Sequence, residues 1–172
     1  MNVLVTVASR HGSTAEIGHA IAEVLAAEGF VVDVRPPDDV PTLAPYDAVV
    51  LGSAVYVGRW TASARAFVDH FATGLAAMPL WLFSSGPVGE PLTPQVDADE
   101  LPSLIARLRP REHRSFAGSL DRESLTLAER AVVALLQVPE GDFRSWDEIA
   151  AWAHSIAAEL HSEHGRRLHA VG

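Results

Sequence analysis

Three short segments rich in hydroxyl groups and glycine have the residue types of a site for an anionic, planar ligand. The first, residues 9–14, reads SRHGST and lies between an apolar run and a helical pattern. Hydroxyl donors from Ser9, Ser13 and Thr14, with close backbone approach at Gly12, would bind a phosphate at a helix N-terminus. The segment lacks the Lys of a nucleoside-triphosphate loop and the three glycines of a dinucleotide fingerprint. It therefore predicts a monophosphate site; the alternative is that Ser13 only caps the helix, together with Glu16.

The other two segments carry groups that suit a flat heterocycle. Residues 53–60 read SAVYVGRW, so that Tyr56 and Trp60 flank Val57 and Gly58. Aromatic rings there would stack on a planar ring system, and the glycine would let its neighbouring peptide rotate. Two half-buried aromatic residues at a strand end are the alternative. Residues 84–89 read SSGPVG, whose hydroxyl and backbone groups would contact the polar edge of such a ring.

Alternating strand and helix patterns must position these segments. Apolar runs predict strands at residues 2–8, 30–34, 48–56, 79–84 and 115–120. Helical spacing follows at residues 14–28, 61–71 and 100–108, and capping-box pairs predict helices from Thr126 and Ser145. This alternation predicts a doubly wound parallel sheet with helices on both faces. The carboxyl ends of such strands share one edge, so the three segments should meet in one crevice.

Composition limits the class of protein. The chain has 172 residues, 48% of them hydrophobic, and a net charge of -9, which argues against nucleic acid as a partner. It contains no cysteine, no apolar run of about 18 residues and no basic leader, which predicts a cytoplasmic protein. We expect one domain at residues 1–165 with a C-terminal tail at 166–172. His161, His164 and His169 lie near the terminus without a further ligand, so no metal site is predicted.

Two longer stretches resemble a known family. Residues 5–21, VTVASRHGSTAEIGHAI, resemble the FMN-phosphate signature of flavodoxins, in which Ser-x-x-Gly-x-Thr joins an apolar strand to a helix. Val7 stands where an aromatic residue is usual, and Gly18 where Ala is usual. Residues 46–60 are similar to the family's third strand and flavin-stacking loop. The resemblance covers nearly the whole chain and is closest to the branch of menaquinone-dependent protoporphyrinogen IX dehydrogenases, on residues 117–120 (AGSL), 146–153 (WDEIAAWA) and an extra helix at 124–136.

The resemblance implies a fold, a cofactor and the residues that bind it. The fold is a flavodoxin-like five-stranded parallel sheet with strand order 2-1-3-4-5, and the cofactor is FMN. The residues implied for the phosphate are Ser9, His11, Gly12, Ser13 and Thr14, with Arg10 as an added ion pair. The residues implied for the isoalloxazine ring are Ala54, Val55, Tyr56, Val57, Gly58, Trp60, Ser84, Ser85, Gly86, Pro87 and Gly89.

The residue after Gly58 bears on the type of chemistry. Electron-carrier flavodoxins usually have an acid there, whereas this chain has Arg59. A cation near the ring stabilises reduced, anionic flavin by about 1 kcal/mol when screened by solvent. This favours an FMN oxidoreductase acting on a quinone, a porphyrinogen or NAD(P)H; an electron carrier serving redox partner proteins is the alternative. No catalytic side chain is assigned, because the flavin carries the chemistry.

Two further segments leave alternatives open. The basic cluster of Arg107, Arg109, Arg111 and Arg114 would dock an anionic porphyrin or simply complement a helix C-terminus. Residues 128–138 are apolar on most of their surface and would cover a sheet face, form a homodimer contact or touch a membrane, in that order of preference. A response-regulator receiver is disfavoured because Ser9 and Ser53 stand where it needs acids. An interaction module without flavin remains the other non-enzyme hypothesis.

Overall fold

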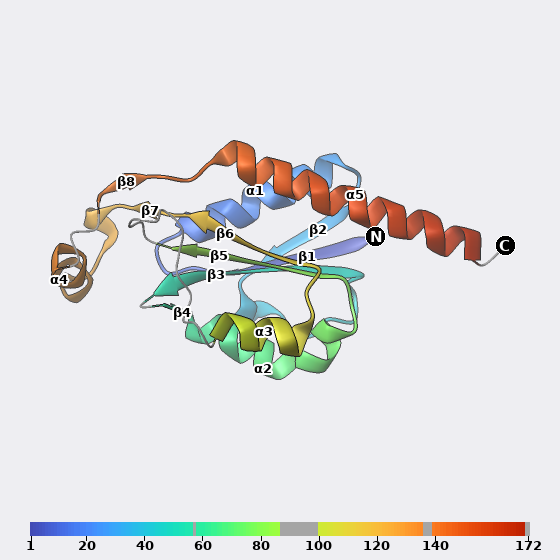
Figure 1. Ribbon diagram of the computed structural model, residues 1–172, viewed down its shortest axis with the longest axis horizontal. Helices are drawn as coiled ribbons and strands as arrows, with labels where there is room; N and C mark the ends of the chain where they lie inside the picture. The colour runs from blue at the N-terminus through green and yellow to red at the C-terminus, as the bar shows by residue number, and fades with distance from the viewer. Residues whose placement is uncertain (57, 87–99, 136–138, 171–172) are drawn as a thin grey trace.

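Five parallel strands form the centre of the molecule, in the order β2-β1-β3-β5-β6 (Figure 1). A computed structural model describes residues 1–56, 58–86, 100–135 and 139–170. The strands are β1 Asn2–Ala8, β2 Val31–Arg35, β3 Ala48–Tyr56, β5 Leu80–Gly86 and β6 Glu112–Ala117. The two-residue β4, Arg59–Trp60, pairs antiparallel with the end of β3. Counted without this short arm, the predicted order of the five parallel strands is confirmed.

Helices cover both faces of the sheet, as predicted. α1 (Ser13–Ala27) and α5 (Trp146–Ala170) lie on one face, and α2 (Ala62–Ala76) and α3 (Glu100–Leu108) on the other (Figure 1). Thr61 is the N-cap of α2, since its side chain accepts a hydrogen bond from the backbone of Ala64. α5 continues to Ala170, so residues 166–170 are helical. The division of the chain at residue 165 stays a prediction.

The fifth predicted strand is wrong in its bounds, because the chain leaves the sheet at Gly118. A Cβ at Gly118 would lie 2.2 Å from the carbonyl oxygen of Gly86, so only glycine allows this approach. β7 (Ser119–Leu120) then pairs antiparallel with β8 (Gly141–Asp142) in a separate two-stranded sheet. Two 3₁₀ turns, η1 (Pro37–Asp39) and η2 (Arg122–Ser124), complete the described elements.

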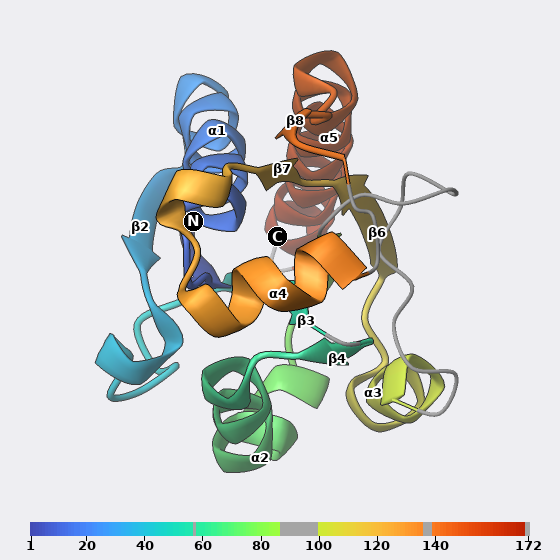
Figure 2. The same cartoon turned by 90° about the vertical axis from the view of Figure 1, so that its left-hand side faces the viewer.

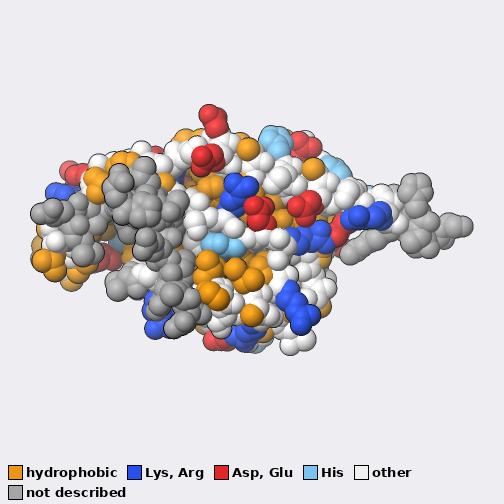
Figure 3. Space-filling view, in the orientation of Figure 1, with side chains coloured by type: hydrophobic (Ala, Val, Ile, Leu, Met, Phe, Trp, Pro, Cys, Tyr) orange, Lys and Arg blue, Asp and Glu red, His pale blue; other side chains and the backbone are white. Residues whose placement is uncertain are grey.

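The predicted cover of a sheet face by residues 128–138 is also wrong for the part that the structure describes. α4 (Leu127–Leu135) lies across the carboxyl ends of the strands, in front of them in Figure 2. None of its nine residues is buried. Figure 3 shows hydrophobic side chains over α4 at this end of the molecule. The predicted capping box is confirmed: the amide of Thr126 donates to Oε2 of Glu129 over 2.9 Å, and the amide of Glu129 to Oγ1 of Thr126 over 3.3 Å.

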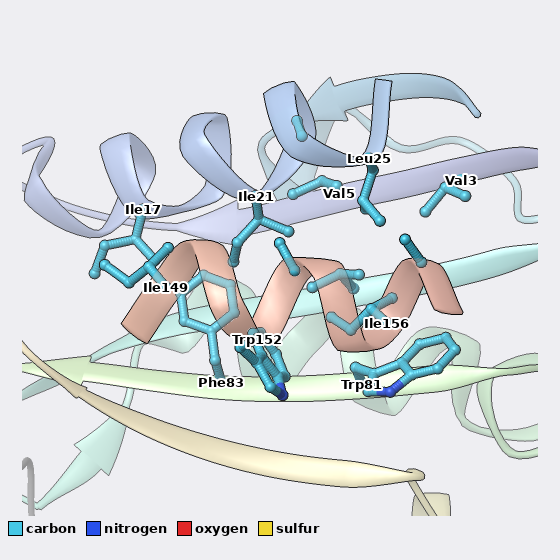
Figure 4. Close-up of a cluster of buried hydrophobic side chains, with 14 of the residues drawn as sticks. Val3, Val5, Ile17, Ile21, Leu25, Trp81, Phe83, Ile149, Trp152 and Ile156 are labelled. Atoms are coloured by element: carbon cyan, nitrogen blue, oxygen red, sulfur yellow. The ribbon is translucent and has the colours of Figure 1, made fainter. Parts of the chain in front are cut away.

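The larger core lies between the sheet and the pair α1 and α5 (Figure 4). Apolar residues of α1 recur every four positions, which turns one stripe of the helix toward α5 and β1. Trp81, Phe83 and Trp152 are almost fully buried there, and each contributes roughly 1.5–3 kcal/mol through removal from water. The other labelled members of this core are Val3, Val5, Ile17, Ile21, Leu25, Ile149 and Ile156. This packing fixes α1, and therefore its N-terminus, relative to the end of β1.

The two departures from the flavodoxin signature contact each other in this core. A Cβ built on Gly18 of α1 would lie 2.4 Å from Cγ2 of Val7 in β1. The β-branched side chain of Val7 is stiff, so it cannot rotate away at low cost. The missing methyl group of Gly18 therefore makes room for Val7. Neither residue lines the cavity at the strand ends.

We predict that Gly18→Ala destabilises the protein when Val7 is present and stabilises it in a Val7→Ala background. With Val7 present, overpacking costs about 1–3 kcal/mol and outweighs the gain of about 1 kcal/mol from the helix propensity of alanine. In a Val7→Ala background the clash is absent, so Gly18→Ala should stabilise the protein. Urea unfolding of the four proteins of this double-mutant cycle measures the coupling. Equal effects of Gly18→Ala in both backgrounds would contradict this packing.

Candidate functional site

One cavity of about 400 Å³ opens at the carboxyl ends of the strands. Residues from all three predicted segments line it, although the first and the third lie about 70 positions apart in the chain. The lining residues that the sequence predicted are Arg10, His11, Ser13, Thr14, Ala54, Val55, Tyr56, Ser85 and Gly86. The fold thus brings the three segments together at the edge where the strand pattern placed them.

The phosphate segment forms the N-terminus of α1. Gly12 is the N-cap with φ +87°, a left-handed conformation that favours glycine, and its amide donates to Oγ of Ser9 over 3.1 Å. No side chain among the described residues caps α1, so the proposed Ser13–Glu16 cap is not formed. Glu16 pairs instead with Arg144 over 2.6 Å. The first-turn amides of α1 therefore remain available to an anion in the cavity.

Tyr56 supplies an aromatic wall beside this loop. The guanidinium carbon of Arg10 lies 5.0 Å from the centre of the Tyr56 ring, and the His11 ring meets it edge-on at 6.2 Å. Burial raises the pKa of Tyr56 above its usual value, so the phenol is neutral near pH 7. A neutral, partly buried ring suits stacking against a planar ligand.

Trp60 and Ser84 lie behind the cavity and do not line it. The Trp60 side chain is 1% exposed in the core under α2, and its Nε1 donates to Oγ of Ser84 over 2.8 Å. His113 Nε2 lies 2.8 Å from the same oxygen. Burial lowers the pKa of His113, which favours the neutral ring as the acceptor of the Ser84 proton. Of the two predicted stacking residues, the structure therefore leaves Tyr56 alone at the cavity.

Both Ser84 and Ser85 were predicted to contact the ligand, but only Ser85 lines the cavity. Its hydroxyl is buried at the cavity wall and has no hydrogen-bond partner among the residues that the structure describes. A buried hydroxyl without a partner is costly unless a ligand or water satisfies it. Val57, Pro87 and Gly89 lie outside the described residues, so their predicted roles stay predictions.

The turn after Tyr56 contains a left-handed glycine, and the neighbouring Arg59 lies beside Glu100 and does not line the cavity. Gly58 has φ +73°. Arg59 lies 4.0 Å from Oε1 of Glu100 and lines a separate cavity of about 320 Å³. Glu100 also accepts a hydrogen bond from the amide of Trp60 over 2.9 Å. Because Glu100 lies beside this guanidinium, its charge is partly compensated, and the tuning role of Arg59 stays a prediction.

One wall of the cavity was not predicted from the sequence. It comes from the segment that includes β7, η2 and α4, and it is mostly apolar. Its residues are Ser119, Leu120, Asp121, Leu125, Ala128, Glu129, Val132 and Val133. The apolar pattern of residues 128–138 was a signal for it, but periodicity does not say whether a helix covers a sheet face or the strand ends.

The basic cluster does not belong to this site. Arg107 pairs with Asp69, Arg111 with Glu159 and Glu163, and Arg114 with Glu112. The amide of Arg111 bonds the carbonyl of Leu80, at the start of β5. Arg111 therefore lies at the amino ends of the strands, opposite the cavity, and Arg107, Arg111 and Arg114 are each paired with an acid.

The fold defines a flavodoxin-like α/β protein with a cavity at the carboxyl ends of its parallel strands. Residues 4–146 match the family model described as flavodoxin domain, so the chain belongs to this family. Membership implies a flavin cofactor and redox chemistry. No helix among the described residues is long and apolar enough to cross a membrane.

The chain is similar to several characterised proteins. It is 27% identical to protoporphyrinogen IX dehydrogenase [quinone] of Escherichia coli K12, over 91% of this chain and 95% of the relative. A flavodoxin from the domain Archaea superposes with a TM-score of 0.63 at 15% identity, covering 94% of this chain and 99% of the other. The rubredoxin oxygen:oxidoreductase of Desulfovibrio gigas superposes with a TM-score of 0.62 at 14% identity, and this chain spans 36% of its length.

The partly buried His113 should make the folded protein less stable in acid. Its pKa in the folded protein lies below the unfolded value of about 6.5, so the unfolded chain binds more protons and stability rises with pH in this window. We expect the free energy of unfolding to fall as the pH drops from 7.5 to 5.5, and to fall less in His113→Gln. Urea unfolding at both values measures this. The exposed His19→Gln is the matched control, and an equal pH response of both variants would disprove the role of His113.

Proposed function

We propose that the chain is an FMN-binding oxidoreductase that exchanges electrons with a quinone or a porphyrinogen-type substrate. One observation supports this proposal above all: a single cavity with an apolar wall is lined by Ser13 and Thr14 at a helix end, by the Tyr56 ring and by Ser85, whose hydroxyl has no partner among the described residues. The relative in Escherichia coli, whose name states protoporphyrinogen IX and quinone, supports the substrate class.

The residues present fit an FMN molecule. The cavity volume falls within the usual range of about 300–1,000 Å³ for small-molecule sites. The uncapped end of α1 would hold the phosphate through its amides and the hydroxyls of Ser13 and Thr14, with Arg10 and His11 beside them. Tyr56 would stack on the ring system, and Ser85 would bond its polar edge. When bound, FMN supplies one- or two-electron transfer at its ring.

The apolar wall supports an organic substrate. Leu120, Leu125, Ala128, Val132 and Val133 face the cavity from the β7–α4 segment. Such a wall excludes water and suits the flat, apolar body of a quinone or a porphyrinogen. NAD(P)H is the further electron donor to test. The protein's own side chains in this arrangement bind, orient and shield the reactants.

The alternative is a flavodoxin-type electron carrier for partner proteins. The Gly58 turn beside Tyr56 favours this alternative, because a rotating peptide there promotes one-electron exchange. Assays of FMN-loaded protein with protoporphyrinogen IX or NAD(P)H, and with a menaquinone analogue as acceptor, distinguish the two. Turnover supports the oxidoreductase; its absence, together with a broad one-electron step in redox titration, supports the carrier.

The outer side of α4 bears on localisation and assembly. Leu127 and Leu135 have exposed fractions of 84% and 82%. We propose a cytoplasmic protein in which this apolar side contacts either a membrane surface, where a quinone dissolves, or a second copy of the chain.

We predict that Gly12→Ala weakens FMN binding about ten-fold. Alanine in the left-handed conformation costs about 1–2 kcal/mol, so the turn of the cofactor-free variant relaxes out of the conformation that Gly12 holds and must recover it to bind the phosphate. Riboflavin, which has no phosphate, should lose less affinity. Quenching of flavin fluorescence during titration of the cofactor-free protein gives both dissociation constants.

The matched control is Gly29→Ala. Gly29 has φ +92° and open space around its Cα, so it bears similar strain, but it lies at the other end of α1. Its variant should lose comparable stability without losing FMN affinity. If both variants bind FMN equally well, the loop at Gly12 does not hold the phosphate.

We predict that Val132→Asp raises the KM for a menaquinone analogue at least about ten-fold. A carboxylate on the cavity side of α4 would disfavour an apolar substrate, and Val132 is already 48% exposed, so the fold should tolerate the change. Leu135→Asp, on the same helix but outside the cavity lining, is the control. Equal KM values for the two variants would show that α4 does not form the substrate wall.

A further inference from the structure

Glu129 joins α4 to the predicted phosphate loop across 118 positions of sequence. Its Oε2 accepts hydrogen bonds from the amide and the hydroxyl of Thr126, over 2.9 and 2.8 Å, at the start of its own helix. Its Oε1 lies 3.2 Å from Nε2 of His11 and 3.8 Å from Nη1 of Arg10. One oxygen of the carboxylate thus accepts the capping hydrogen bonds of α4, and the other contacts the predicted phosphate loop.

This carboxylate is ionised inside the cavity. The backbone hydrogen bond from Thr126, then its hydroxyl and the His11 ring, lower the pKa of Glu129 to about 2. The side chain is 26% exposed and lines the same cavity as Ser13 and Thr14. Because an ionised carboxylate only accepts hydrogen bonds, the His11 ring donates to it.

Among the described residues, the other side-chain hydrogen bonds of α4 reach only the turn before it: Arg130 donates to the carbonyl oxygens of Leu125 and Glu123, each over 3.1 Å. None of its residues is buried, and the small apolar cluster beneath it joins Val133 to Leu120, Leu125 and Phe143. The contact of Glu129 with His11 and Arg10 is therefore a substantial part of what fixes α4 over the cavity.

We propose that Glu129 sets the affinity of the site for phosphate, because its carboxylate competes with the phosphate of the cofactor for Arg10 and His11. This inference rests on the proposed function. A phosphate monoester carries a charge of about -1.5 to -2 and binds Arg more strongly than a single carboxylate oxygen at 3.8 Å does. Two anions beside Arg10 and the His11 ring repel each other, so occupancy of the phosphate subsite releases Oε1 of Glu129.

The release has a consequence for the apolar wall. Once Oε1 is free, α4 keeps its capping box but loses its polar contact with the phosphate loop. Cofactor binding therefore loosens the helix that covers the substrate side of the cavity, and entry of a substrate follows entry of the phosphate. The side chain of Glu129 thus sets the order in which the cofactor and the substrate bind.

Glu129→Gln tests the competition without removing the helix cap, because glutamine also serves at this position of a capping box. We expect the variant to bind FMN at least about five-fold more tightly than the wild type, at the lower end of usual coupling between sites. Riboflavin affinity should stay within two-fold. Glu23→Gln, an exposed residue of α1, makes the same change in net charge and should leave both affinities unaltered.

Hydrogen exchange of the cofactor-free proteins gives a second measurement that needs no flavin. Amides of residues 127–135 should exchange faster in Glu129→Gln than in Glu23→Gln, because the contact with His11 and Arg10 is lost. Equal exchange in the two variants would overturn the proposal that this contact fixes α4.

The outcomes separate this inference from the proposed function. If the wild type binds FMN but Glu129→Gln binds it no better, or if riboflavin gains as much as FMN, the competition is disproved and the cofactor assignment stands. If the wild type binds neither flavin, the proposed function itself fails and the inference fails with it.

Discussion

The packing of α1 against β1 is the constraint on which the rest of the site depends. Ile17, Ile21 and Leu25 hold the helix to the sheet and to α5, and the space left by Gly18 admits Val7. This packing fixes the position of the helix N-terminus relative to the end of β1. The turn between them needs a left-handed residue, which Gly12 provides. A phosphate site built from amides needs this rigidity, since the donors must be in place before the anion arrives.

Charge compensation would let an acidic protein hold the proposed anionic cofactor. The chain has a net charge of -9, yet the cavity presents a helix N-terminus, Arg10 and His11 next to hydroxyl groups. The neighbouring Glu129 contacts Arg10 and the His11 ring when no other anion does. Outside the cavity, by contrast, Arg107 and Arg111 are paired with acids of α2 and α5 and join neighbouring helices and strands.

The two sides of the cavity have different chemistry, and this supports an organic redox substrate. The loop side carries hydroxyls, amides and cations, which suit a mononucleotide. The β7–α4 side carries Leu120, Leu125 and Val132, which suit a flat apolar molecule beside the ring. The chain leaves the sheet at Gly118, where contact with the backbone of Gly86 admits no side chain, and this exit directs the following segment across the strand ends.

The sequence by itself predicted the two helical layers and the edge at which the three loop segments meet, and its resemblance to flavodoxins implied the strand order and most of the loop residues at the cavity. It could do so because parallel strands place their carboxyl ends at one edge and because helix N-termini bind phosphates. Only the tertiary structure decided that Trp60 is buried under α2, that Ser85 rather than Ser84 reaches the cavity, and that α4 crosses the strand ends with Glu129 on the phosphate loop. Local patterns record which residues are apolar and how they repeat. Contacts between residues far apart in the chain decide the rest. They determine to which side of a strand end an aromatic ring turns, and which element an apolar helix covers.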